Sequence, residues 1–316
     1  MHSFSIKAKV IVNPDSKPRR VKRYLRQSLR ILRHNGFELS VYFTKGPGEV
    51  PPAARDAVAQ GFEAVIVVGG DGTINEIING LAETDKTLGM LPIGNGNDYA
   101  TLLSVKGSYI QALNILEENK KTELDLGVAI ADTKHYFANI AETGITSVIA
   151  KASYTELKWI KGLPKYYILG LKKISSYKPI QAHIRVDNYE RKTKLIVCAI
   201  GLGYRFGGGF NVLPGNKPYF GDFQVCIAGD VPKWKWYWMI NKIKNGTHGD
   251  IKGVNFVRGK KIEIETEKPL PIEGEGEVFS ENSTKATFEL SQLKLKIIVG
   301  KEFLRNKIEF ETRNKK

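Results

Sequence analysis

The stretch that decides the fold is Ala64-Val-Ile-Val-Val-Gly-Gly-Asp-Gly-Thr-Ile-Asn-Glu-Ile-Ile-Asn-Gly80. Its first five residues are apolar and mostly β-branched, which predicts a buried strand. Glycines end that strand, and Ile74, Ile77 and Ile78 then recur at the spacing of an amphipathic helix. The stretch therefore predicts a strand, a tight turn and a helix, as found in parallel α/β sheets.

The turn in this unit is suited to binding phosphate. Gly69, Gly70 and Gly72 carry no Cβ, so we expect positive φ angles and backbone N–H groups close to an anion. Thr73 is expected to cap the following helix, whose positive dipole end faces the same anion. Asp71 is unusual among such amides, and it implies either Mg²⁺ coordination or an ordered hydrogen-bonding role.

Composition indicates a globular protein of two domains, since the chain has 316 residues and is 42% apolar. Cys198 and Cys226 lie in apolar runs and are expected to be buried thiols in a reducing compartment. Neither a signal-peptide pattern nor an 18-residue apolar window occurs, so we expect a cytoplasmic protein. The five histidines are scattered, and we assign them no metal or catalytic role.

The net charge of +15 requires an anionic partner or a strongly solvated surface. No zinc-knuckle or RNP pattern occurs, so an anionic membrane surface is expected rather than nucleic acid. Residues 17–33 predict a helix with eight basic residues and no acidic one, and its outer face suits solvent or a phosphate-bearing surface equally well. Residues 153–176, where lysines alternate with apolar residues, are the better membrane-facing candidate.

The segment from Val231 to Ile240 holds Trp234, Trp236 and Trp238 with lysines between them. Such a pattern suits a membrane interface. Packing of a helix against the core is the favoured alternative, because tryptophan is usually mostly buried.

Strands alternate with helices over residues 1–124, which predicts a doubly wound parallel sheet. After residue 124 the sequence pattern changes to short β-rich runs separated by turn residues. The last predicted strand covers residues 287–299. We therefore expect a mostly antiparallel β-sandwich over residues 125–299, with helical inserts near 153–176 and 232–245. Residues 300–316 are a candidate for return to the first domain.

Ligands in doubly wound sheets bind beyond the carboxyl ends of the strands. Four loops meet that description: Asn13-Pro14, Thr44 to Gly48, Gly69 to Thr73, and Ile93 to Asp98. The last contains Gly94-Asn-Gly-Asn-Asp98, which follows a strand and precedes a helix as the first glycine turn does. Two such loops side by side could enclose a triphosphate, although Asn-Gly pairs are also plain turn formers.

With both glycine loops in place, the chain resembles the diacylglycerol kinase catalytic-domain family, which includes bacterial lipid kinases and sphingosine kinases. The matching motifs are Asn13-Pro14, Gly69 to Glu76, Leu91 to Asp98, Asp125-Leu-Gly127, Phe137-Ala-Asn-Ile140, Gly207 to Pro214, and Glu275-Gly-Glu277. The resemblance thus covers nearly the whole chain. It implies an NAD kinase-like α/β domain that binds ATP, a β-sandwich domain, and a cleft between them where a lipid hydroxyl takes the γ-phosphate.

The resemblance implies, by position in the motifs, which loop residues bind the nucleotide. These are Asn13, Thr44, Gly69, Gly70, Asp71, Gly72, Thr73, Asn75, Glu76, Gly94, Asn95, Gly96, Asn97 and Asp98. Asp71, Glu277 and Glu275 are the implied catalytic residues, with Glu277 as the base, Glu275 beside it and Asp71 as the candidate Mg²⁺ ligand. A hydroxyl nucleophile needs such a base, while Mg²⁺ and backbone amides neutralise the phosphoryl charge.

The chain departs from the family pattern at four places. Asp15-Ser-Lys-Pro18 stands where a Ser-Gly pair is usual, Asn95 replaces threonine, and Glu275 replaces aspartate. Tyr219-Phe-Gly221 replaces an acidic pair, which argues against a structural Mg²⁺ site of the family. Apart from the resemblance, the acidic run from Glu273 to Glu277 reads as a solvated turn.

The sequence therefore predicts an ATP- and Mg²⁺-dependent lipid kinase that associates reversibly with the inner membrane surface. Diacylglycerol, a sphingoid base, phosphatidylglycerol or another alcohol is the acceptor, and a homodimer is left open. One rival is NAD kinase, although its Asn-x-Gly-x-Leu-Gly-Phe run is absent. The other is a nucleotide- or lipid-binding protein with impaired catalysis, which the departures at Asn95 and Glu275 suggest.

Overall fold

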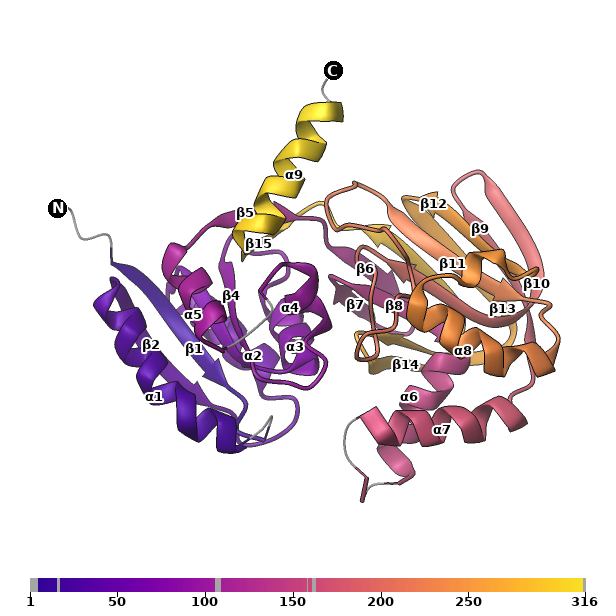
Figure 1. Ribbon diagram of the computed structural model, residues 1–316, viewed down its shortest axis with the longest axis horizontal. Helices are drawn as coiled ribbons and strands as arrows, with labels where there is room; N and C mark the ends of the chain where they lie inside the picture. The colour runs from indigo at the N-terminus through magenta and orange to yellow at the C-terminus, as the bar shows by residue number, and fades with distance from the viewer. Residues whose placement is uncertain (1–4, 16–17, 106–108, 158, 161–162, 315–316) are drawn as a thin grey trace. The chain divides into compact units, whose positions relative to one another are not determined.

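The structure is a computed structural model that describes residues 5–15, 18–105, 109–157, 159–160 and 163–314. Its chain divides into two compact units (Figure 1). Unit 1 comprises Met1–Leu124 and Leu293–Lys316, and unit 2 comprises Asp125–Gln292. Within the described residues, no helix is both long enough and apolar enough to cross a membrane.

Unit 1 is built on a six-stranded sheet in the order β2-β1-β3-β4-β15-β5. Its strands are β1 (Ile6–Val12), β2 (Phe37–Phe43), β3 (Ala64–Gly69), β4 (Thr87–Pro92), β5 (Lys121–Leu124) and β15 (Leu295–Ile298). All neighbouring strands are parallel except β5, which runs antiparallel to β15. Every residue of β3 is buried, as expected for a β-branched strand covered on both faces.

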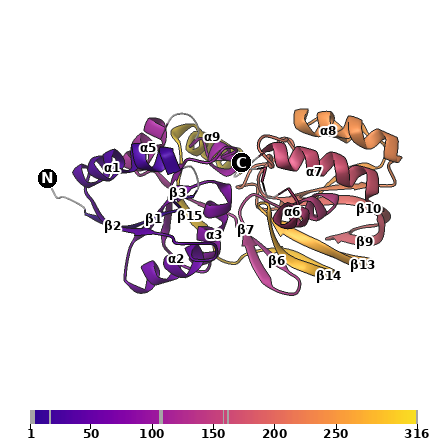
Figure 2. The same cartoon turned by 90° about the horizontal axis from the view of Figure 1, so that it is seen from below.

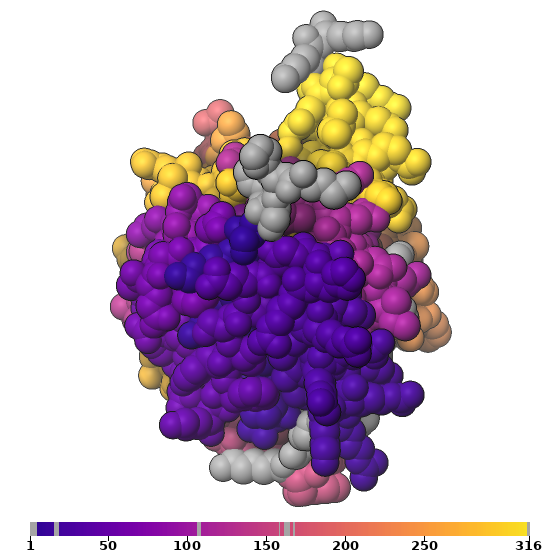
Figure 3. Space-filling model, turned by 90° about the vertical axis from the view of Figure 1, so that its left-hand side faces the viewer, coloured from indigo at the N-terminus to yellow at the C-terminus, as the bar shows by residue number. Residues whose placement is uncertain are grey.

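Helices cover both faces of this sheet. They are α1 (Pro18–His34), α2 (Val50–Ala59), α3 (Asp71–Leu81), α4 (Asp98–Leu102) and α5 (Tyr109–Glu118). Helix α9 (Lys301–Asn314), in which Phe303 is buried, extends away from the sheet (Figure 1). Helices α1 and α5 contact each other on one side, and α2 contacts α3 on the other (Figure 2). The surface over α1 and β2, at the indigo end of the chain, faces the viewer in Figure 3. The predicted doubly wound α/β domain is confirmed.

Unit 2 is a β-sandwich in which the neighbouring described strands pair antiparallel. Its strands are β6 (Gly127–Ile130), β7 (Lys134–Phe137), β8 (Ile140–Gly144), β9 (Ile180–Val186), β10 (Tyr189–Gly201), β11 (Phe223–Gly229), β12 (Val254–Gly259), β13 (Lys261–Gly274) and β14 (Glu277–Leu290). The strand order is β12-β11-β10-β8-β13-β14-β6-β7, and β9 bridges β10 and β13. The expected antiparallel sandwich is confirmed.

Helices of unit 2 lie together against one face of this sheet. They are α6 (Ile145–Thr155), α7 (Leu163–Ser176) and α8 (Trp236–Asn245), with the short 3-10 turns η1 (Lys233–Lys235) and η2 (His248–Asp250). One hydrophobic core lies within the sandwich around Phe137 and Phe223. A second core joins the helices to the sheet and includes Ile145, Ile174 and Trp236.

Three expectations about element boundaries need correction. The predicted strand over 287–299 is two strands: β14 ends at Leu290, and β15 joins unit 1 because it pairs with β4 and β5. Residues 293–299 therefore cluster with the first unit rather than the second. The predicted insert over 153–176 is the end of α6 followed by α7.

Candidate functional site

The carboxyl ends of four parallel strands in unit 1 carry the loops expected to bind a ligand. Asn13 follows β1, Thr44 follows β2, Gly70 follows β3 and Ile93 follows β4. In this sheet β2 lies on one side of β1, and β3 followed by β4 lies on the other side. The direction in which strands are added therefore reverses between β1 and β3. Such a reversal point is where doubly wound sheets bind their ligands.

Direct contacts join the loops after β1 and β3. The Asn13 amide Nδ2 donates a hydrogen bond of 3.1 Å to the Thr73 hydroxyl, and the Asn13 backbone N–H donates to Val68 O at 3.1 Å. On the other side of β1, the Thr44 N–H donates to Val12 O at 3.0 Å. Three of the predicted nucleotide-binding residues therefore belong to one connected edge of the sheet.

The glycines of this edge serve close packing rather than positive φ. Gly70 is extended, with φ −99° and ψ −172°, and none of Gly69, Gly70 and Gly72 is in the left-handed region, so that expectation is wrong. A Cβ on Gly69 would lie 2.6 Å from the Thr73 Cβ, and one on Gly94 would lie 2.8 Å from the Gly70 Cα. A side chain at Gly94 would push the two glycine loops apart, and one at Gly69 would displace Thr73 within the first loop.

The helix behind the first glycine loop begins earlier than expected. Helix α3 starts at Asp71 with Gly70 at the N-cap position, so Thr73 lies inside the first turn and does not cap it. The Thr73 hydroxyl instead accepts the hydrogen bond from Asn13. The residue in the left-handed conformation is Asn97, with φ 49°, which precedes the short helix α4.

Asp71 links the two glycine loops. Its Oδ1 accepts a hydrogen bond of 3.3 Å from the Tyr99 N–H in the first turn of α4. Burial, and next the nearby charge of Asp98, raise the pKa of Asp71, while the backbone N–H groups of residues 97–99 lower it. Of the two roles that the sequence left open for Asp71, the ordered hydrogen bond is thus present.

The remaining predicted nucleotide residues surround these loops. Asn75 is buried in α3, and Glu76 accepts a hydrogen bond from the Gly48 N–H, so α3 also contacts the loop after β2. Burial raises the pKa of Glu76. Asn95 is exposed, whereas the Asn97 Oδ1 is buried and has no hydrogen-bond partner among the described residues.

The acidic run of unit 2 forms a tight hairpin between β13 and β14. Gly274 pairs with Glu277, and the two residues between them have positive φ angles, 57° at Glu275 and 87° at Gly276. This is the geometry of a type I′ turn, which favours Asn-Gly or Asp-Gly. Glu275, which replaces the aspartate usual in the family, therefore has a longer side chain on a residue in the left-handed backbone conformation.

The side chain of Glu275 is occupied by the neighbouring loop. Its Oε1 accepts hydrogen bonds from the Ala138 N–H at 3.1 Å and the Asn139 N–H at 2.6 Å. Two backbone donors thus hold the strained turn in place. Glu273 is 2% exposed, so the solvated-turn interpretation is wrong for it.

Glu277 opens β14 and is only partly buried. Tyr154, from α6, lies beside it and accepts a hydrogen bond from the Val278 N–H. Burial, and next the charge of Glu277, raise the pKa of Tyr154 to about 12 although 54% of the residue is exposed. Sequence analysis missed Tyr154, because nothing in the spacing of α6 connects it with a hairpin more than 100 residues away.

Sequence analysis also missed Glu142, an acidic residue of β8. It lies directly opposite Glu273 in the β8–β13 register, and the two residues are 1% and 2% exposed. Burial raises the pKa of Glu142 to about 7, and burial together with the charge of Glu142 raises the pKa of Glu273 well above its usual range. Burial thus favours the uncharged form of both acids.

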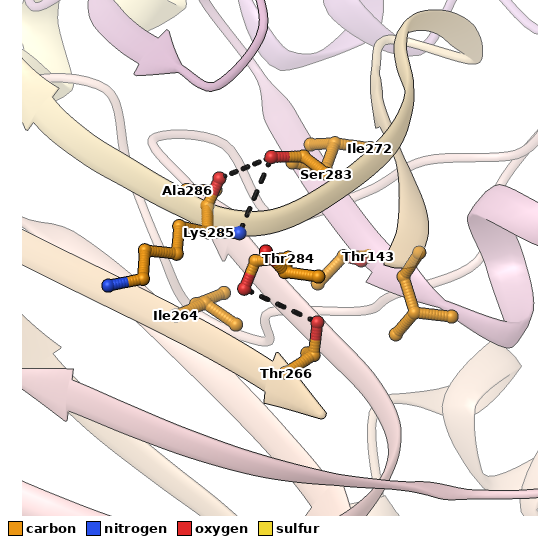
Figure 4. Close-up of a pocket in the computed structure, with 9 residues that line it drawn as sticks. Thr143, Ile264, Thr266, Ile272, Ser283, Thr284, Lys285 and Ala286 are labelled. Carbon is orange, nitrogen blue, oxygen red and sulfur yellow. Dashed lines mark hydrogen bonds between the residues drawn. The ribbon is translucent and has the colours of Figure 1, made fainter. Parts of the chain in front are cut away.

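Unit 2 contains a small cavity whose lining includes Thr143 and Ile272, the chain neighbours of Glu142 and Glu273. It opens where the β13–β14 register shifts, and Figure 4 shows Thr143, Thr266 and Thr284 at its wall. The cavity is about 10 Å³, on the scale of a single water molecule. None of the predicted site residues lines it.

Comparison with known proteins agrees with this arrangement. Residues 7–129 match the family model of the diacylglycerol kinase catalytic domain, and residues 139–298 match that of the YegS C-terminal NAD kinase β-sandwich-like domain. A Chromohalobacter salexigens protein named "Probable lipid kinase YegS-like" is 32% identical over 265 residues, which cover 82% of this chain and 84% of that protein. A Staphylococcus saprophyticus diacylglycerol kinase is 28% identical over 273 residues, with 85% and 88% covered. The chain belongs to the diacylglycerol kinase catalytic-domain family.

Solved structures support the same fold. A diacylglycerol kinase from Bacillus anthracis Sterne has a TM-score of 0.73 at 22% identity, covering 94% of this chain and 98% of its own. An NAD kinase from Archaeoglobus fulgidus in complex with ATP has a TM-score of 0.54 at 18% identity, with 95% and 96% covered. The expected NAD kinase-like architecture is confirmed.

Proposed function

We propose that this chain is a lipid kinase that transfers the γ-phosphate of ATP to a lipid hydroxyl, with Mg²⁺ as cofactor. The observation that carries the proposal is the junction of the two glycine loops at the reversal point of the sheet. There, Asn13 bonds to Thr73, and Gly94 approaches Gly70 too closely for a side chain. The positive end of α3 at this junction favours a phosphate group.

The donors of unit 1 suit Mg²⁺ bound together with a nucleotide. Within the described part of the chain, no cluster of three His, Cys, Asp or Glu side chains could hold a metal alone. Asp71 and Asp98 are close enough for their charges to interact. Mg²⁺ is commonly held by one or two carboxylates plus substrate phosphates and water, so these two residues fit it. When bound, the ion would neutralise charge on the transferring phosphoryl group.

In unit 2, Glu277 is the proposed general base. It takes the proton of the lipid hydroxyl as that oxygen forms a bond to the γ-phosphorus and the bond to the bridging oxygen breaks, releasing ADP. Glu275 holds the turn through its two backbone hydrogen bonds and does not accept the proton. A diacylglycerol-like or sphingoid alcohol is the proposed acceptor.

Transfer of labelled phosphate provides the test. The protein is incubated with ATP labelled at the γ-phosphate, Mg²⁺ and a total lipid extract, and the labelled lipid is identified. A labelled lipid phosphate, formed from a lipid alcohol, supports the proposal. Label in added NAD instead supports the NAD kinase alternative, and ATP binding without any transfer supports a binding protein with impaired catalysis.

We also propose that the protein works at the cytoplasmic face of the inner membrane and associates with it reversibly. The net charge of +15 supports this proposal, because anionic lipids attract basic residues near the surface by about 1 kcal/mol each. Binding should weaken with salt, since exposed charges are screened over roughly 8 Å at physiological ionic strength.

Replacing Lys158, Lys161, Lys165 and Lys172 with glutamine is expected to release the protein from anionic vesicles. Lys158 and Lys161, like Lys17 of the predicted basic helix, lie outside the described residues. Lys172 forms an ion pair of 2.6 Å with Glu156, so its replacement also disturbs a structural contact. Vesicle binding by this variant that matches wild type would count against docking driven by charge.

A further inference from the structure

Of the three tryptophans between Val231 and Ile240, one is buried in the core and two are exposed at the surface. Trp236 is 4% exposed, and its Nε1 donates a hydrogen bond of 2.9 Å to Val231 O. Trp234 and Trp238 are 67% and 73% exposed. The favoured expectation of core packing is thus correct for Trp236 and wrong for its two neighbours, because the helical period turns them to the opposite side.

The neighbouring helix α7 shows the same division. Leu169 and Ile174 are buried against the unit, whereas Ile168 and Leu171 are 44% and 52% exposed. Large exposed apolar side chains that gather on one face commonly mark an interaction site.

The two helices are fastened to each other at their ends. The Lys233 ammonium donates hydrogen bonds to Ser175 O at 2.5 Å and to Tyr177 O at 3.3 Å. The rings of Tyr177 and Trp236 lie 6.1 Å apart. Figures 1 and 2 show α7 and α8 side by side on the same face of unit 2. We use the term aromatic surface for the large exposed apolar side chains on the described parts of α7, η1 and α8, namely Tyr166, Ile168, Leu171, Trp234, Tyr237 and Trp238.

The charge around the aromatic surface has one sign. The segments Leu163–Ser176 and Lys233–Asn245 contain seven lysines and no acidic residue. Glu156 pairs with Lys172 and Lys173, each at 2.6 Å, and so neutralises part of α7. On η1, the Lys235 ammonium lies 5.2 Å from the centre of the Trp234 ring. A partner for this surface must therefore accept indole rings and also carry negative charge.

An anionic bilayer meets both demands. Tryptophan and tyrosine are enriched at membrane interfaces, where the ring enters the headgroup region and the polar edge stays wet, and lysine stems extend toward the charged headgroups. The same helical layer reaches the proposed base: α7 contacts α6, Ser153 Oγ donates to the Tyr166 hydroxyl at 3.5 Å, and Tyr154 lies beside Glu277.

We propose that unit 2 docks on anionic membranes through the aromatic surface, with Trp234 and Trp238 inserted among the lipid headgroups. This proposal rests on the proposed function in one respect, namely that the substrate is a lipid held in a bilayer. Charge then brings the protein to the surface, and the indole rings retain it.

The test compares Trp234→Ala/Trp238→Ala with wild type and with Ile110→Ala. Ile110 is a matched control, since it is 63% exposed on α5 of unit 1 and belongs to no proposed site. Each protein is co-sedimented with vesicles of equal parts phosphatidylglycerol and phosphatidylcholine, and with phosphatidylcholine alone.

Removing two indole rings of about 200 Å² each should lower partitioning onto the anionic vesicles roughly tenfold or more, and Ile110→Ala should match wild type. A soluble quencher should reach the wild-type tryptophans less well when anionic vesicles are present.

Phosphate transfer to a short-chain diacylglycerol in detergent separates the two proposals. Retained transfer in the double variant, together with lost vesicle binding, supports docking through the aromatic surface. Vesicle binding equal to wild type overturns the docking proposal while leaving the kinase proposal intact. Absence of vesicle binding by wild type, with a concentration-dependent dimer that the double variant lacks, overturns it in favour of an interface between copies. Absence of transfer by wild type counts against the kinase alone.

Discussion

The two units differ in what surrounds the carboxyl groups that they hold away from water. In unit 1, Asp71 receives a backbone N–H at the start of α4 and keeps some exposure. In unit 2, Glu142 and Glu273 face each other from neighbouring strands, almost fully buried, and the Glu142 Oε2 has no hydrogen-bond partner among the described residues.

Burial raises the pKa of all three acids, but only at Asp71 do backbone N–H groups oppose that rise. Backbone donors at a helix start stabilise a carboxylate, and a charge held there can meet a cation that accompanies phosphate. Burial of two facing carboxyl groups favours their uncharged form instead, so we expect this pair to affect the stability of its unit rather than the transfer step. Substitutions at four positions, in order of decreasing expected effect, test the contrast.

The largest effect is expected at Asp71. Asp71→Asn and Asp71→Ala should each lower phosphate transfer by roughly 10³, because both remove the negative charge proposed to handle Mg²⁺. Asparagine can still accept the Tyr99 N–H, so only Asp71→Ala should also lose about 1 kcal/mol of stability. Turnover with labelled ATP and thermal unfolding measure the two effects. Wild-type turnover in Asp71→Asn would restrict Asp71 to its hydrogen-bonding role.

The next effect concerns Glu277. Glu277→Gln should lower kcat by roughly 10² or more with the ATP KM little changed, because the substitution removes the base but keeps the shape of the turn. Steady-state kinetics with varied ATP and a soluble lipid measure both constants. A parallel loss of ATP affinity would point to a structural or metal-binding role.

The buried pair predicts a dependence of stability on pH. Burial raises the pKa of Glu142 from 4.5 to about 7, so between these values the folded state binds more protons than the unfolded state. Stability of unit 2 should therefore fall as pH rises through this window, on the order of 2 kcal/mol from about pH 5 to pH 7.

Glu142→Gln should weaken that dependence, since a neutral amide of the same shape replaces the titrating group. Urea unfolding at several pH values measures the slope for wild type and variant. Glu273 remains buried in the variant, so part of the slope should persist. Identical slopes in the two proteins would show that Glu142 contributes no proton linkage.

The smallest effect is expected at Glu275, which holds its turn through hydrogen bonds. Glu275→Ala leaves the Ala138 and Asn139 N–H groups without their acceptor and should cost about 1–2 kcal/mol. Glu275→Gln retains an acceptor oxygen and should cost less. Thermal unfolding of both variants, with transfer activity measured in parallel, is the test. A loss of activity in Glu275→Gln as large as in Glu277→Gln would assign Glu275 to the chemistry itself.

Much of unit 1 could be predicted because its signals are local. The apolar run of β3, the glycines that end it and the period of α3 all lie within 17 consecutive residues. Local signals did not reveal why the glycines are needed. Their role depends on Thr73 and on the second glycine loop, both of which come close only after the strands have paired.

Unit 2 was harder to predict, because its site is assembled across distant strands. Glu142 pairs with Glu273, which is more than 100 positions away in the sequence. No periodic pattern in the sequence predicts this pairing. The acidic run looked like a solvated turn because five residues of Glu and Gly have high local polarity. Burial of Glu273 was decided by β8, which lies against it in the sheet.

The sequence by itself determined the parallel glycine-loop domain, the antiparallel second domain and the basic charge, since strand and helix periods and turn residues act over a few positions. Tertiary structure alone decided that β15 completes the first sheet, that Tyr154 reaches Glu277, and which tryptophans face solvent. The physical reason is that register, burial and side-chain contact are set by the partners of a segment, and these partners lie elsewhere in the chain.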